Sequence, residues 1–72
     1  MGNIGQYEIY MFLKGNSPLK FTTKEIAKAM GVNMSSAQIA LIKIRTFYDE
    51  IRYTERAKLN GGIEYVYWYA GD

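Results

Sequence analysis

Residues 22–44, TTKEIAKAMGVNMSSAQIALIKI, predict two helices joined by a tight turn. Thr22 stands three residues before Glu25, the spacing of a capping box, in which each side chain accepts a hydrogen bond from the other residue's backbone amide. Gly31 is expected to end the first helix, since glycine tolerates a left-handed backbone. Asn33 is a good N-cap for the second helix. The predicted helices cover residues 23–30 and 34–48.

The segment before this pair predicts a further helix and a short strand. Apolar residues recur every three or four positions over residues 4–14, beginning with Ile4, so we expect a first helix that is mostly buried. Gly15 and Asn16 would end it. Residues 19–21 are then expected to form a short extended piece that leads into the next helix.

The C-terminal third predicts a β-hairpin. From Ile51 onward the apolar period changes from 3.6 to 2. Two alternating runs flank Asn60-Gly61-Gly62, and Asn-Gly tolerates the positive φ values of a tight turn. The chain is therefore predicted to have an α+β fold with three helices, a short strand and a C-terminal hairpin over residues 51–69. Its length favours one small domain over residues 1–72.

The faces of this hairpin depend on its register. With an even-numbered turn, one face would gather the basic residues of the first strand and the tyrosines of the second. These are Arg52, Arg56, Lys58, Tyr65, Tyr67 and Tyr69. The other face would turn Trp68 toward the helices as the core anchor. The basic face would suit a sugar-phosphate backbone, and ordinary packing of arginine over tyrosine rings explains it equally well. A three-residue loop would exchange the faces of one strand.

The composition narrows the classes of function. The chain has no His and no Cys, which excludes Ser-His-Asp and Cys-His nucleophile systems and the zinc sites built from these residues. Its only adjacent acidic pair, Asp49 and Glu50, cannot converge on a substrate because neighbouring side chains point in different directions. We therefore expect no enzyme, no cofactor and no metal. A cysteine-free sequence without a signal-like or membrane-spanning run is expected in the cytoplasm, with neither a membrane nor a small-molecule partner.

The charge is unevenly distributed along the chain. The formal net charge is +2, but residues 14–45 hold six basic residues against the single acid Glu25, a local balance of +5. Such a basic segment is suited to a polyanion. Solvated lysines on ordinary helices would give the same balance.

The spacing within residues 22–44 resembles a helix-turn-helix. Ala27 is small where the two helices would cross, Gly31 turns the corner, and Val32 would fill the gap beneath the turn. With a helix before it and a hairpin after it, nearly the whole chain resembles a winged helix-turn-helix domain of the MarR or ArsR kind. The resemblance is greatest to the short stand-alone versions among archaeal and viral transcription regulators.

This resemblance implies a transcription regulator that binds double-stranded DNA, with helix 34–48 in the major groove and the hairpin as a wing along the minor groove or backbone. Carried over by position, the DNA-binding residues would be Thr23, Lys24, Met34, Ser35, Gln38, Ile39, Ile42, Lys43, Arg52, Arg56, Lys58 and Asn60. Gln38 is the best base reader, because its amide can both donate to and accept from adenine. Ser35 and Lys43 would contact phosphate, and the start of the second helix would add free backbone amides.

Two of these residues are compatible with more than one kind of binding partner. Ile39 and Ile42 would face outward, where a groove-reading helix usually shows Arg, Lys, Asn or Gln. They would pack against thymine methyl groups, or a second subunit or another protein would cover them. The latter alternative makes the chain a winged-helix protein-interaction module in a larger assembly. A weaker third alternative is single-stranded nucleic acid stacked on the hairpin tyrosines. A homodimer on two half-sites is expected for a DNA reader with so few base-reading groups.

Overall fold

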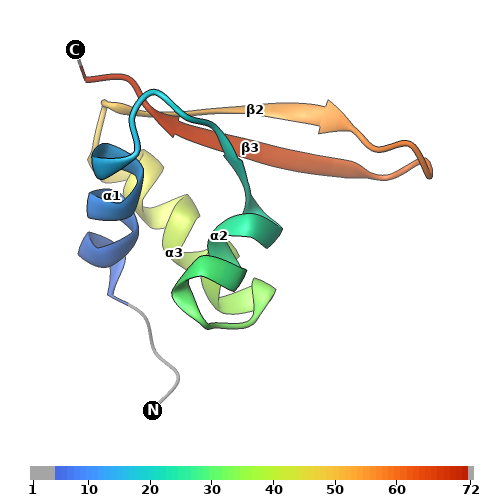
Figure 1. Cartoon of the computed structure of the whole chain (residues 1–72), viewed down its shortest axis with the longest axis horizontal. Coiled ribbons are helices and arrows are strands. Elements are labelled where there is room, and N and C mark those ends of the chain that lie inside the picture. The colour runs from blue at the N-terminus through green and yellow to red at the C-terminus, as the bar shows by residue number, and fades with distance from the viewer. Residues whose placement is uncertain (1–4, 72) are drawn as a thin grey trace.

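The computed structural model describes residues 5–71, which form three helices on one side of a three-stranded antiparallel sheet (Figure 1). The elements are α1 (Gln6–Gly15), β1 (Phe21–Thr22), α2 (Thr23–Met30), α3 (Met34–Phe47), β2 (Ile51–Ala57) and β3 (Ile63–Tyr69). The strand order is β1-β3-β2, so the C-terminal strand lies at the centre of the sheet. This confirms the predicted α+β architecture. Ile4, the predicted start of the first helix, lies outside the described residues.

Local sequence fixes both ends of α2 and the start of α3. The Thr22 hydroxyl accepts a hydrogen bond from the Glu25 amide at 3.1 Å, and Glu25 Oε1 accepts one from the Thr22 amide at 2.8 Å. Gly31, at φ 73°, caps the C-terminus of α2 in the left-handed conformation. Asn33 Oδ1 accepts from the Ser36 amide at 2.8 Å and so begins α3. The predicted capping box, helix-ending glycine and N-cap are all confirmed.

The core lies between the three helices and the base of the hairpin. Its largest fully buried side chains are Ile9, Leu13, Ile26, Leu41 and Ile44. Ile51 and Tyr67 join them from the hairpin. Residues 52–61 are all exposed, and Figure 1 shows the hairpin extending well beyond the helices. The base of the hairpin is therefore packed into the core, whereas its loop end is exposed to solvent.

The hairpin closes with a three-residue loop, the alternative to the even-numbered turn on which the predicted faces depended. The Lys58 amide donates to the Gly62 carbonyl at 2.8 Å, and the Gly61 amide donates to the Lys58 carbonyl at 3.2 Å. Gly61 has φ 95°, whereas Asn60 does not have positive φ. A two-residue type I′ turn needs positive φ at both central residues, so this backbone forms a turn followed by one left-handed glycine instead.

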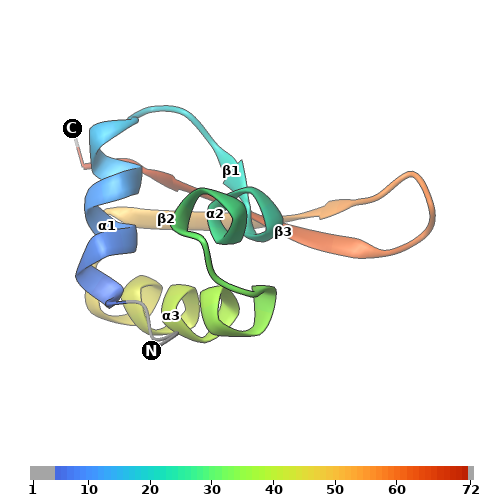
Figure 2. The same cartoon turned by 60° about the horizontal axis from the view of Figure 1, so that its bottom comes forward.

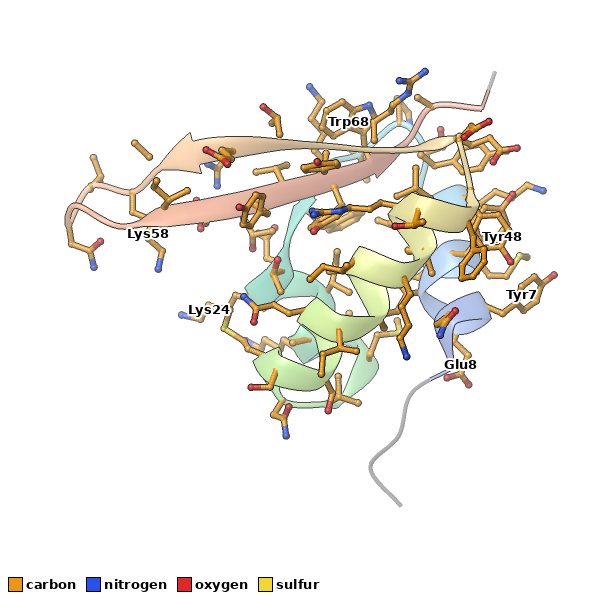
Figure 3. All side chains as sticks on the ribbon, turned by 180° about the vertical axis from the view of Figure 1, so that it is seen from behind. Tyr7, Glu8, Lys24, Tyr48, Lys58 and Trp68 are labelled. Carbon is orange, nitrogen blue, oxygen red and sulfur yellow. The ribbon has the colours of Figure 1, made fainter. Side chains whose placement is uncertain are left out.

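The odd-numbered loop exchanges the faces of one strand. Tyr67 pairs with Tyr53, faces the helices and is only 2% exposed. Trp68 pairs with Arg52 on the opposite face, where Figure 3 shows it pointing away from the helices. The prediction of Trp68 as the core anchor is therefore wrong, and Tyr67 takes that place. The predicted face that combines basic residues with tyrosines is also wrong. Arg52 and Arg56 lie on one face of the hairpin, whereas the β3 tyrosines pair with the alternate residues of β2 on the other face.

Candidate nucleic-acid interface

One side of α3 is turned toward solvent. Its other side is buried through Ala37, Ala40, Leu41 and Ile44. The exposed side carries Ser35, Gln38, Ile39, Ile42 and Lys43. Ile39 is 56% exposed and Ile42 is 49% exposed. Since α3 contains no acidic residue, no side chain of this helix would repel a polyanion.

A hollow of about 120 Å³ lies beside this exposed side, between the starts of α2 and α3 and the hairpin. Its lining residues are Thr23, Lys24, Met34, Gln38, Lys58, Ile63, Glu64 and Tyr65. A second, more open depression shares Lys24, Lys58 and Glu64 and reaches Asn60 at the hairpin loop. Figure 3 shows Lys58 pointing from the hairpin toward the side on which Lys24 lies. Two lysines that are far apart in the sequence thus line the same depression.

The charge of this hollow is positive. Glu64 is the only acid that lines it, beside Lys24 and Lys58. The Glu64 carboxylate is already paired, because Arg56 donates to Oε2 from Nη2 at 2.6 Å and from Nε at 2.9 Å. The pair leaves the two ammonium groups without an opposing carboxylate among the lining residues. An anion is the ligand that this arrangement favours.

Arg45 joins α3 to the hairpin beside the hollow. Its guanidinium carbon lies 4.0 Å from the centroid of the Tyr53 ring, and Nη1 donates to the Tyr67 hydroxyl at 3.2 Å. The rings of Tyr53 and Tyr67 are themselves stacked, with centroids 5.8 Å apart. A planar guanidinium can stack on one ring and donate to another at the same time. Arg45 therefore connects α3 to both strands of the hairpin.

Burial changes the ionisation of two tyrosines. It raises the pKa of the Tyr67 hydroxyl, and the neighbouring Arg45 opposes part of that rise. It also raises the pKa of Tyr10, with a further contribution from the hydroxyl of Tyr69. Tyr10 lies in α1, and its ring stacks on that of Tyr48 with centroids 4.1 Å apart. Both phenols are neutral near pH 7, so Tyr67 does not neutralise the charge of Arg45.

The structure brings most of the predicted DNA-binding residues to one side of the molecule. The hollow and the adjoining depression gather Thr23, Lys24, Met34, Gln38, Arg56, Lys58 and Asn60. The exposed side of α3 adds Ser35, Ile39, Ile42 and Lys43. Thr23 is 4% exposed, so it offers little surface. Arg52 lines neither depression, and it pairs with Trp68 near the base of the hairpin.

Sequence reasoning missed Arg45 and the β3 residues that line the hollow, Ile63 and Tyr65. A signal for Arg45 was present, since it follows Gln38 by seven residues, two helical turns, and so lies along the same side of α3. To predict the β3 residues, the hairpin register must be known. Asn60-Gly61 does not determine it, because this pair is compatible with both a two-residue and a three-residue loop.

Residues 5–71 offer neither a metal site nor a membrane-spanning helix. No three side chains of the acidic, His or Cys type gather there in a way that could hold a metal ion. No helix in that range is both long enough and apolar enough to cross a membrane.

Comparisons with known proteins bear on the fold. No protein-family model matches the sequence, and no curated protein matches it. The structure is similar to a chain from Methanosarcina mazei Go1 described as a "possible transcriptional regulator", with a TM-score of 0.79, 14% sequence identity and 89% of this chain covered. The match covers 52% of that chain, about half its length. At this identity, the likeness shows a shared fold, an α+β arrangement of three helices and a C-terminal hairpin.

Proposed function

We propose that this chain binds double-stranded DNA and acts as a transcription regulator of the winged helix-turn-helix kind, similar to MarR and ArsR proteins. In this proposal α3 enters the major groove and the β2–β3 hairpin is a wing along the backbone. The observation that carries it is the acid-free, exposed side of α3 beside a hollow lined by Lys24 and Lys58. Its fold is shared with a chain described as a possible transcriptional regulator, which supports the same function.

Each proposed contact follows from the chemistry of the side chain. Gln38 pairs with adenine, because its amide supplies one donor and one acceptor. Lys24 and Lys58 neutralise phosphates on the side of α3 where the hollow lies, and Ser35 and Lys43 contact phosphate from α3 itself. Asn60 approaches the backbone from the wing loop, whereas Arg52 faces away and Arg56 already pairs with Glu64.

We further propose that residues 1–72 form one domain and that this domain acts as a homodimer. It acts inside the cell, where the genome is. Two copies on neighbouring half-sites would multiply affinity without further base contacts. The outer side of α1 offers a surface for the second copy, since Tyr7 is 61% exposed and Met11 is 42% exposed. Sedimentation equilibrium should show a dimer that Met11→Glu converts to a monomer. A wild-type monomer that binds DNA one to one would contradict this part of the proposal.

Duplex binding measured over a range of salt concentrations tests the proposed function. Binding releases counterions, so the logarithm of the association constant should fall linearly with the logarithm of salt, by about 0.9 for each phosphate neutralised. Lys58→Ala and Lys24→Ala should each weaken binding and reduce that slope by about 1.

Arg52→Ala is the matched control, because it removes the same charge from the far face of the sheet. It should leave affinity and slope nearly unchanged. Equal losses from Arg52→Ala and Lys58→Ala would indicate diffuse attraction to the net charge. Binding that does not respond to salt would rule out a phosphate-contacting interface.

The exposed apolar side chains of α3 favour a second candidate function, a protein-interaction module in a larger assembly. Phe47 is 73% exposed, in addition to Ile39 and Ile42. A contact made by such residues should hardly depend on salt, in contrast to binding of DNA.

A further inference from the structure

We infer that α3 recognises thymine methyl groups in the major groove, through Ile39 and Ile42. The inference rests on the proposed function and names the base that this side of the helix selects. It accounts for two isoleucines at positions where a groove-reading helix usually carries hydrogen-bonding side chains.

The two isoleucines form one short apolar strip. They stand three residues apart on successive turns, with 56% and 49% of their surface exposed. Side chains at this spacing have Cβ atoms about 5 to 6 Å apart. Because bases along one strand rise about 3.4 Å per step, the strip spans one to two base steps. Two thymines within that distance match it.

Thymine is the base whose edge such a strip can read. In the major groove the thymine methyl is the apolar group among hydrogen-bond donors and acceptors. An isoleucine against another base edge would remove water from polar groups without replacing their hydrogen bonds, which is unfavourable. Burying one methyl group against an isoleucine strengthens binding about fourfold, from the usual free energy for a buried carbon.

The neighbours of the strip favour DNA over a protein partner. Lys43 lies on the same exposed side, and Lys24 and Lys58 line the adjoining hollow, so the strip is flanked by cations. The Thr46 hydroxyl donates to the Ile42 carbonyl at 2.9 Å, so it is already engaged within the helix. Gln38 precedes Ile42 by one turn, which places an adenine-reading amide beside the methyl-reading strip. Together they select A·T pairs.

Deoxyuridine tests this inference, since it pairs like thymidine and lacks only the 5-methyl group. A random duplex library of about 20 base pairs, two helical turns, is made once with thymidine and once with deoxyuridine. The protein should retain the thymidine library preferentially. Duplexes recovered from it should share two thymines within one to two steps. Replacing each of these by deoxyuridine should weaken binding about fourfold per methyl group, and about fifteenfold for both.

Variants assign the effect to α3. Ile39→Ala and Ile42→Ala should fold normally, because both side chains are exposed, and each should lose the preference for thymidine at one position. Leu19→Ala is the matched control: Leu19 is 58% exposed, and it lies in the connection between α1 and β1, on the opposite side of the molecule from α3 (Figure 2). This variant should keep the full preference.

The outcomes separate this inference from the proposed function. Equal binding of both libraries by the wild type would overturn the inference and leave duplex binding in place. Binding of neither library at low salt would overturn both. If both libraries bind equally and Ile39→Glu also converts a dimer to a monomer, a second copy covers the strip and the inference is wrong.

Discussion

The Arg45 guanidinium contacts the hairpin twice, over the Tyr53 ring and at the Tyr67 hydroxyl. A lysine cannot make both contacts, because its ammonium group is neither planar nor forked. We predict that Arg45→Ala lowers the free energy of unfolding by about 1 to 2 kcal/mol. Arg45→Lys should lower it by nearly as much. Urea unfolding of the variants measures both values.

A double-mutant cycle shows whether this loss comes from the hairpin contact. Tyr67→Phe removes the hydrogen-bond acceptor and keeps the ring. Because the two residues touch, the losses from Arg45→Ala and Tyr67→Phe should be non-additive by about 0.5 to 1 kcal/mol. Tyr7→Phe, on the exposed side of α1, should be additive with Arg45→Ala. A cycle for Arg45 and Tyr67 that closes to zero would contradict the contact.

The raised pKa of Tyr67 predicts a loss of stability in alkali. The unfolded chain releases the phenolic proton near pH 10, whereas the folded chain holds it to higher pH because burial disfavours the phenolate. Above about pH 10 the unfolded state therefore binds fewer protons, and the free energy of unfolding falls as pH rises. Tyr10 acts in the same direction.

Urea unfolding at about pH 9 and about pH 11 measures this change. Tyr67→Phe removes one of the two groups, so the variant should lose less stability over that interval than the wild type. An equal loss in both proteins would mean that Tyr67 is not the group responsible.

At the scale of elements, the turn between α2 and α3 depends on the backbone of Gly31. Its φ is 73°, and a Cβ added there would meet no atom within 4 Å. Gly31→Ala should therefore cost about 1 to 2 kcal/mol from backbone strain alone. Gly31→Asn should cost less, since asparagine tolerates the left-handed region better. The free energy of unfolding from urea titrations gives these differences.

Gly15 supplies the control for this prediction. It is the last residue of α1, with ordinary φ and no atom within 4 Å of an added Cβ. Gly15→Ala should leave stability unchanged or raise it by up to about 1 kcal/mol, because alanine favours the helix. A loss from Gly15→Ala as large as that from Gly31→Ala would contradict the account based on φ.

The elements also show which features the sequence can predict. The Thr22–Glu25 box and the Asn33 cap depend on residues three positions apart, so local pattern was sufficient. The hairpin register was not predictable in this way. Asn60-Gly61 permits two loop lengths, and the choice between them decides whether Tyr67 or Trp68 faces the core.

At the scale of the whole molecule, the candidate interface is assembled from distant parts of the chain. Lys24 and Lys58 line one hollow because the hairpin passes beside the start of α2. The sequence indicated both lysines through the resemblance to winged helices, but the pairing of Arg56 with Glu64 and the position of Arg52 followed from the register. The exposed side of α3 follows from the helical period alone, whereas the faces of β3 depend on the loop length and were not predicted correctly.

Mapping a bound DNA duplex onto the protein tests whether α3 and the hairpin bind DNA. Backbone amide chemical shifts are recorded during titration with a duplex recovered from the random library. The largest changes should fall in residues 34–43 of α3, at Lys24 and in the loop around Lys58 and Asn60. Residues of the far sheet face, such as Arg52 and Trp68, should change little. Changes centred on that far face, or none at saturating duplex, would contradict the claim that α3 and the hairpin bind DNA.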